Sequence, residues 1–168
     1  AAGPDVIAPG EGELIVNRCA LTGPGLGEID LTARIVQADA TFWYAIDDGN
    51  TLAIYDSTAA LGAARLVLAD KSLLERGLKA LAAVTGQPIS ATRANLARDI
   101  RRYQPSGVLI SQSMTQLLDT VARFVEQGGT LTIDAQPERP VGFDRFEYLT
   151  SPSADLVSVL GLKATLSR

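Results

Sequence analysis

The chain has 168 residues, of which 46% are hydrophobic, 20% are charged and 5% are aromatic. It contains no histidine and one cysteine, and its 15 basic and 19 acidic side chains give a formal net charge of −4. These numbers exclude Ser–His–Asp and Cys–His catalysis, thiolate zinc cages and internal disulfides in their usual forms. The acidic balance argues against nucleic-acid binding and against charge-driven attachment to an anionic membrane.

The length corresponds to one domain of about 100–200 residues. Residues 1–12 are rich in Gly and Pro, so we expect a flexible N-terminal segment followed by a single domain over residues 13–168. No apolar run reaches the roughly 18 residues that a membrane-spanning helix needs. The start at Ala1 fits signal-peptide removal and an arbitrary boundary equally well, which leaves the compartment open.

The first part of the chain alternates between apolar and polar residues, the pattern of strands with one buried face. The predicted strands are Glu13–Cys19, Ile29–Ile35, Thr41–Ile46, Thr51–Tyr55 and Arg65–Ala69, with a turn at Leu21–Gly27. Between the third and fourth strands, the Asp-Gly step of Asp47-Asp48-Gly49-Asn50 predicts a β-hairpin, because Gly and Asn tolerate positive φ.

The middle of the chain changes to a helical period. A first helix is expected to be capped by Asp70, to end at Gly86 and to bury one apolar face made of Leu73, Leu74, Leu78, Leu81 and Val84. A second helix starts near Pro88 and is interrupted by Pro105. A third has apolar residues at helical spacing from Ile110 to Val125 and ends at Gly128-Gly129.

The end of the chain returns to strands. Thr130–Ala135 alternates, Ser153 is expected to cap a short helix that stops at Gly161, and Leu162–Leu166 is a final strand. This order of strands, helices and strands predicts an α+β fold. It would contain an antiparallel or mixed β-sheet with three to four helices packed on one face.

A basic helix face is one candidate binding site. Arg98, Arg101 and Arg102 lie close together, Tyr103 follows them, and bidentate arginine contacts suit a phosphate or carboxylate. Asp99 lies inside this cluster and partly neutralises it. A solvated helix face explains the same pattern without a ligand.

Trp43 is the other candidate, because it lies in the aromatic run Phe42-Trp43-Tyr44. In a strand, Trp43 points away from the face that its two neighbours share, and either face could serve as a ligand platform. Core packing on both faces is the alternative.

The remaining motifs favour structural interpretations, so we expect neither a metal site nor a cofactor. Asp47-Asp48 lacks the glycine spacing of a calcium loop, and Gly23-Pro24-Gly25-Leu26-Gly27 precedes a strand rather than a helix. Cys19 has no neighbouring base and is expected to be an inert, at least half-buried thiol. The carboxylates Glu138, Asp144 and Glu147 keep open a hydrolase that works with two acidic groups.

Two stretches resemble a known group of proteins. Leu66–Arg76 joins a strand to an Asp-capped amphipathic helix, and Gly128–Val141 contains Gly-Thr-Leu-Thr-Ile followed by Pro-x-x-Pro-Val. Over roughly Arg65–Leu166, the chain resembles the C-terminal part of secreted or periplasmic bacterial envelope proteins that are distantly AsmA-like. The resemblance implies export and a non-catalytic role in lipid or envelope handling, and it carries over no catalytic residue.

We therefore expect a non-catalytic, periplasmic or secreted envelope module that binds an apolar ligand such as a lipid, or another envelope protein. A cytoplasmic location is the alternative for its compartment. A structural subunit of a larger complex and a carboxylate-based hydrolase are the alternatives for its function.

Overall fold

An antiparallel sheet of seven strands organises the computed structural model, which describes residues 6–7, 12–104, 110–145 and 155–168. The strands are β1 (Val6–Ile7), β2 (Glu13–Gly23), β3 (Gly27–Val36), β4 (Ala60–Asp70), β5 (Thr130–Ala135), β6 (Val141–Gly142) and β7 (Leu162–Ser167). The helices are α1 (Ala40–Asp47), α2 (Leu73–Thr85), α3 (Ile89–Arg101), α4 (Gln112–Gln127) and α6 (Leu156–Val159), with 3₁₀ turns η1 (Thr51–Asp56) and η2 (Phe143–Arg145). The predicted α+β class is confirmed.

The strand register gathers the apolar side chains of the sheet on one face. The strands follow the order β1-β2-β3-β4-β5-β7, and β6 pairs with one end of β4. Residues directly opposite each other in adjacent antiparallel strands share a face. One continuous apolar row therefore crosses five strands, through Leu21, Ile29, Leu68, Leu131 and Leu166.

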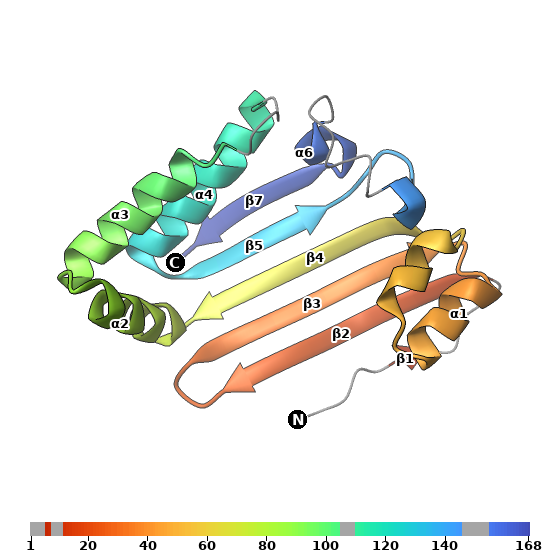
Figure 1. Cartoon of the computed structure of the whole chain (residues 1–168), viewed down its shortest axis with the longest axis horizontal. Helices are drawn as coiled ribbons and strands as arrows, with labels where there is room; N and C mark the ends of the chain where they lie inside the picture. The colour runs from red at the N-terminus through yellow and green to blue at the C-terminus, as the bar shows by residue number, and fades with distance from the viewer. Residues whose placement is uncertain (1–5, 8–11, 105–109, 146–154) are drawn as a thin grey trace.

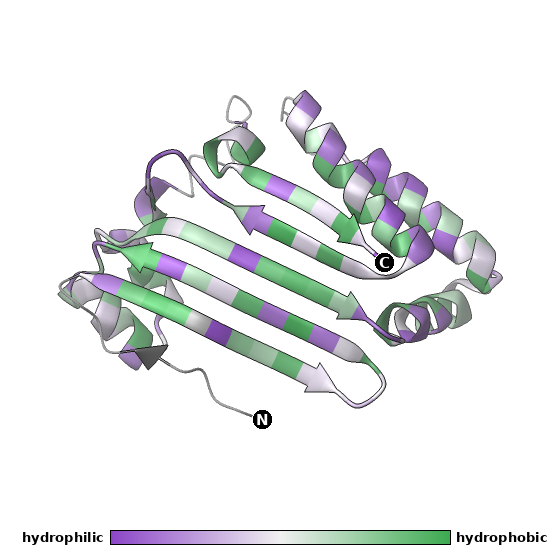
Figure 2. Ribbon diagram, turned by 180° about the vertical axis from the view of Figure 1, so that it is seen from behind, coloured by the Kyte–Doolittle hydropathy of each residue, from purple (hydrophilic) through white to green (hydrophobic). Residues whose placement is uncertain are grey.

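Cross-strand ion pairs occupy the opposite face, which none of the described helices covers (Figure 2). Arg18 on β2 bonds both Glu28 and Asp30 on β3, and Arg65 lies 3.6 Å from Asp134 across β4 and β5. Charged pairs of this kind are stable in water. This polar face is therefore the solvent side of the sheet.

The helices cover the apolar face at its two ends and leave a gap between them (Figure 1). At one end, Phe42 of α1 packs into a core with Leu14, Ala38 and Ala59. At the other end lie α2, α3 and α4, and α4 packs against β7. Within β4, the central strand, Ala60 alone is buried. We call the uncovered apolar strip between α1 and α2 the trough.

The predicted β-hairpin at residues 41–55 is wrong, because this segment forms α1 and η1. The carboxylate of Asp39 accepts hydrogen bonds from the backbone N–H groups of Phe42 and Thr58, at 2.9 and 3.1 Å, and so caps the helix. The helical period then buries Phe42, which is 1% exposed, and leaves Tyr44 71% exposed. Gly49 does adopt the expected positive φ of 65°, but it follows a helix rather than a strand.

The strands are longer than the sequence pattern predicts. β2 continues past Cys19 to Gly23, through residues expected to form a turn, and β4 begins at Ala60 rather than at Arg65. Both extensions pair with β3, which supplies their backbone hydrogen bonds. A register shift after Val16 marks a β-bulge that the alternation did not reveal.

The three helices of the middle segment are confirmed, but the buried face predicted for α2 is wrong. Leu78 is buried, whereas Leu73 is 49% and Val84 86% exposed.

In the described part of the chain, no helix has both the length and the apolar character that crossing a bilayer requires.

The predicted helix cap Ser153 and most of the predicted flexible segment lie outside the described residues. Asp155 caps α6 by accepting from the N–H of Ser158 at 3.2 Å. Val6–Ile7, within the predicted flexible segment, pair with β2. Gly86 and Gly161 end their helices with positive φ, as expected.

Candidate functional site

A groove of about 420 Å³ lies where the trough meets α2 and α4. Strand ends of β2, β3 and β4 form its floor, while the start of α2 and the C-terminal turn of α4 form its wall. The apolar side chains that line it are Leu21, Leu26, Ile29, Leu68, Leu73, Leu74 and Phe124. The volume falls within the roughly 300–1,000 Å³ that is typical of small-molecule sites.

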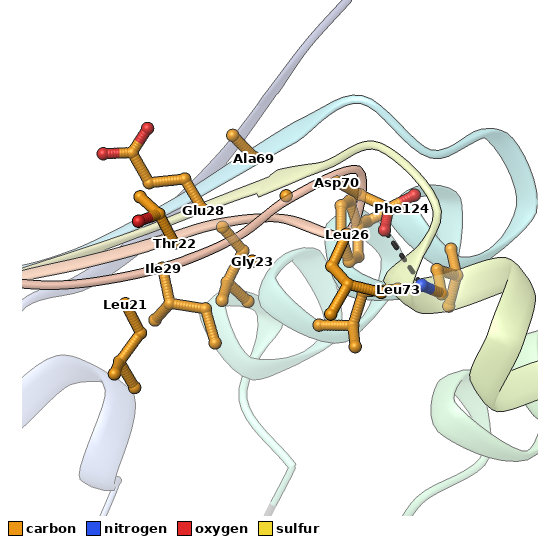
Figure 3. Close-up of a pocket in the computed structure, with 13 residues that line it drawn as sticks. Leu21, Thr22, Gly23, Leu26, Glu28, Ile29, Ala69, Asp70, Leu73 and Phe124 are labelled. Atoms are coloured by element: carbon orange, nitrogen blue, oxygen red, sulfur yellow. Dashed lines mark hydrogen bonds between the residues drawn. The ribbon is translucent and has the colours of Figure 1, made fainter. Parts of the chain in front are cut away.

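The wall of the groove is fixed because the β2–β3 turn is fastened to the start of α2. The carbonyl oxygen of Leu26 accepts hydrogen bonds from three consecutive N–H groups, those of Lys71, Ser72 and Leu73, at 3.0–3.1 Å. The hydroxyl of Ser72 donates to the carbonyl oxygen of Gly25 at 2.6 Å. Leu26 and Leu73 are thereby held side by side (Figure 3).

Asp70 joins three elements where the groove meets the start of α2. Its carboxylate accepts from the N–H of Leu74 at 2.9 Å, which confirms its predicted role at the start of α2. Its own N–H donates to the carbonyl oxygen of Gly129, just before β5, at 3.0 Å. These bonds fix the angle at which α2 leaves the sheet.

Most polar groups near the groove are directed away from it or already bonded. Figure 3 shows Leu21 and Ile29 on one side of the strands and Glu28 on the other, where Glu28 pairs with Arg18. Among the described residues, no cluster of three His, Cys, Asp or Glu side chains could hold a metal ion. What the groove offers a ligand is apolar contact, worth about 25 cal/mol for each Å² removed from water.

The arginines of α3 lie apart from this groove, and several of them tie the helices together. Arg93 donates to the carbonyl oxygen of Val125 at 2.8 Å and to Glu75 at 2.5 Å. Arg101 bonds Asp119 and Glu126 of α4, and these bonds raise its pKa further above the ordinary value and lower that of Glu126. The basic face of α3, which the sequence suggests as a ligand-binding site, thus contributes contacts between α3 and its neighbouring helices.

The other members of the predicted basic site are more exposed. Arg98 lies beside Asp99 at 3.3 Å and lines a hollow of about 350 Å³ between α2 and α3. Arg102 and Tyr103 follow the helix and are exposed, and their side chains make no hydrogen bond with the described residues. Ligand binding by Arg98, Arg101, Arg102 and Tyr103 stays a prediction.

Trp43 is half-buried on α1, at the other end of the trough from the groove. Its ring meets that of Phe42 edge to face, with centroids 5.4 Å apart, and packs against the core around Leu14. This packing fits the core alternative, and a ligand at Trp43 likewise stays a prediction.

Cys19 is exposed, so the expectation of an at least half-buried thiol is wrong. It lies opposite Leu31 on the apolar face of the sheet, where the trough leaves it uncovered. Of the acidic residues considered for a hydrolase, Glu138 and Asp144 are exposed, and Glu147 lies outside the described residues.

The sequence did not single out the residues that form the groove. The helical spacing predicts a buried helix face that includes Leu73 and Leu74, and the glycines predict a turn that includes Leu21 and Leu26. The alternation from Ile29 onward did place Ile29 on an apolar strand face. The alternation does not show that the described helices leave the part of that face around Ile29 partly uncovered, because the path of α2 depends on distant contacts.

Together, the fold and the groove define an open-faced α+β protein with an uncovered apolar trough. A family model described as "Uncharacterized protein" matches residues 20–167, and the chain belongs to that family. No curated protein and no solved structure matches the chain.

Proposed function

We propose that this protein is a non-catalytic module of the bacterial cell envelope that holds an apolar ligand, such as a lipid acyl chain, in its groove. The observation that carries the proposal is the groove of about 420 Å³, lined by apolar side chains and continuous with the trough. Leu21 is 64% exposed there, so covering it with a ligand would remove apolar surface from water.

The envelope location rests on the resemblance to secreted and periplasmic AsmA-like proteins. A sheet that leaves part of its apolar face uncovered fits such a role, because an exposed apolar surface of this kind marks a place where something binds. The absence of histidine supports a role in binding rather than in bond-making.

The test is titration with a fluorescent fatty acid kept below its critical micelle concentration. Wild-type protein should bind the probe saturably, and Leu21→Gln should weaken binding several-fold because it places an amide in the apolar lining. Leu21 is largely exposed, so this variant should fold normally. Leu52→Gln is the matched control, because Leu52 is 74% exposed on η1 and does not line the groove.

Equal binding by wild-type protein and Leu21→Gln would contradict the groove as the binding site. No saturable binding by wild-type protein would contradict the ligand proposal altogether. The melting temperatures of both variants should stay within a few degrees of the wild type, because exposed side chains contribute little to stability.

A role as an assembly subunit is the second candidate, and the edge of the sheet favours it. In the described residues, β1 pairs with β2 only opposite Ile15 and Val16, so the outer edge of β2 from Arg18 to Gly23 has no strand partner there. Such an edge can accept a strand from another chain. Sedimentation velocity tests this role, and a monomer at all concentrations would count against self-assembly.

A further inference from the structure

Helix α2 exposes an apolar side, whereas a surface helix normally turns its apolar side toward the core. Leu73, Gly77, Ala80, Leu81 and Val84 are all exposed, and their spacing places them along one side of the helix. Only Leu78 and Ala82 of α2 are buried. We call these five exposed residues the α2 ridge.

Positive charge accompanies the α2 ridge, although the chain as a whole is acidic. From Asp70 to Gln87 the sequence contains three cations, Lys71, Arg76 and Lys79, and two carboxylates, Glu75 and Asp70, of which Asp70 is bonded to the N–H of Leu74. Arg93 binds Glu75 at 2.5 Å, whereas Lys79 is 3.9 Å from it. Within the described part of the chain, the side chains of Lys71 and Arg76 make no hydrogen bond or ion pair.

A second exposed apolar patch, on α1 and η1, has the opposite electrostatic character. Tyr44, Leu52 and Tyr55 are exposed there. No Lys or Arg occurs between Arg34 and Arg65, and the acidic residues of that stretch are Asp39, Asp47, Asp48 and Asp56. The two patches thus expose similar apolar side chains beside charges of opposite sign.

We propose that the α2 ridge docks this protein onto the surface of an anionic bilayer. An interfacial helix buries its apolar side at the boundary of headgroups and acyl chains and places Lys and Arg near the lipid phosphates. The ridge and its cations have this composition, while the patch on α1 and η1 would be repelled by the same surface. The charge of the whole chain, −4, conceals this local contrast.

Docking through α2 would bring the groove to its source of ligand. Leu73 belongs to the ridge and also lines the groove, so the two surfaces are continuous. An acyl chain leaving the bilayer beside Leu73 would reach the groove without crossing water. This step rests on the proposed function, since it assigns the groove a lipid taken directly from a membrane.

Vesicle co-sedimentation tests the docking. Wild-type protein should bind vesicles of phosphatidylcholine with phosphatidylglycerol and bind pure phosphatidylcholine vesicles much more weakly. Arg76→Gln should reduce binding to the anionic vesicles by about fivefold, since each cation near such a surface contributes a factor of about five. Val84→Glu should reduce it by roughly tenfold or more.

The matched control is Leu52→Glu, which makes the same kind of change on the other exposed patch and should leave vesicle binding unchanged. Unaltered sedimentation of Val84→Glu with the anionic vesicles would overturn the proposal. So would a wild-type protein that fails to bind them, or one that forms a dimer broken by Val84→Glu, because α2 would then contact a protein.

The fatty-acid titration separates this inference from the proposed function. Val84 does not line the groove, so Val84→Glu should lose vesicle binding and keep its affinity for the monomeric probe. A wild-type protein that binds the probe but no vesicles would refute docking and leave the groove function standing. One that binds vesicles but no probe would support docking alone and refute the groove function.

Discussion

Arg101 of α3 and Glu126 of α4 form a bidentate ion pair, with Nη1–Oε1 and Nη2–Oε2 distances of 2.6 and 2.9 Å. The same guanidinium bonds Asp119, two helical turns earlier on the same face of α4, at 3.0 Å through Nε. Bidentate geometry is what makes an arginine–carboxylate contact specific. A residue that the sequence offers as a ligand contact therefore joins two helices.

Replacing Arg101 should loosen the contact between α3 and α4. We expect Arg101→Gln to lower the melting temperature by about 2–4 °C at neutral pH, while Arg102→Gln changes it by less than about 1 °C. Because Arg101 lowers the pKa of Glu126, the stabilisation is complete above the ordinary glutamate pKa and is lost as the pH falls through the lowered value. Thermal melts of the three proteins from neutral to acidic pH test both points.

The aromatic run offers a direct test of helix against strand. Phe42→Ala should cost about 3–5 kcal/mol of unfolding free energy, because it empties a fully buried site, whereas Tyr44→Ala should cost less than about 0.5 kcal/mol. In a strand the two side chains would share a face and their replacement would have similar effects. Urea denaturation of both variants measures the difference.

Gly27 allows β3 to pass close to the end of β4. A Cβ atom at Gly27 would lie 2.2 Å from the carbonyl oxygen of Ala69, and the φ of Gly27 is 134°. We expect Gly27→Ala to destabilise the fold by about 1–3 kcal/mol. Gly25→Ala is the control, because φ is also positive there but no atom lies within 4 Å, so its cost should be about 1 kcal/mol or less.

The cap of α1 should make stability depend on pH. The N–H groups of Phe42 and Thr58 lower the pKa of Asp39, so its carboxylate stabilises the folded state fully above the ordinary aspartate pKa, near 3.9. This contribution disappears as the pH falls through the lower folded-state pKa. Asp39→Asn should therefore melt roughly 1–4 °C below the wild type at neutral pH, and the gap should close in acid.

Asp56→Asn is the control for the cap. Asp56 is exposed, and its side chain makes no hydrogen bond with the described residues. If both variants shift the acid limb of the stability profile equally, the effect reports overall charge and not the cap.

Sequence patterns succeed here where local chemistry decides the structure. Asp70 and Gly86 mark the two ends of α2 because a cap and a left-handed stop act over a few residues. The strand at Thr130–Ala135 matches its prediction at both ends. In these segments, residues close together in the sequence determine where each helix or strand begins and ends.

The patterns fail where packing at a distance decides the structure. Phe42-Trp43-Tyr44 suits a strand by its composition, but the cap at Asp39 and the core around Leu14 select a helix. Val84 has the helical spacing of a core residue, yet no described element packs over it. The groove escaped prediction for the same reason, since a side chain's periodicity does not reveal whether another element covers it.

The position of Cys19 has a practical consequence. It supplies the chain's sole sulfur nucleophile, points to the bare side of the strands beside Leu31, and is accessible to reagents. A polarity-sensitive dye attached to Cys19 would report in real time when a ligand occupies the trough and displaces water from it. No engineered mutation is needed for this. The native molecule thus contains its own attachment point for a spectroscopic sensor.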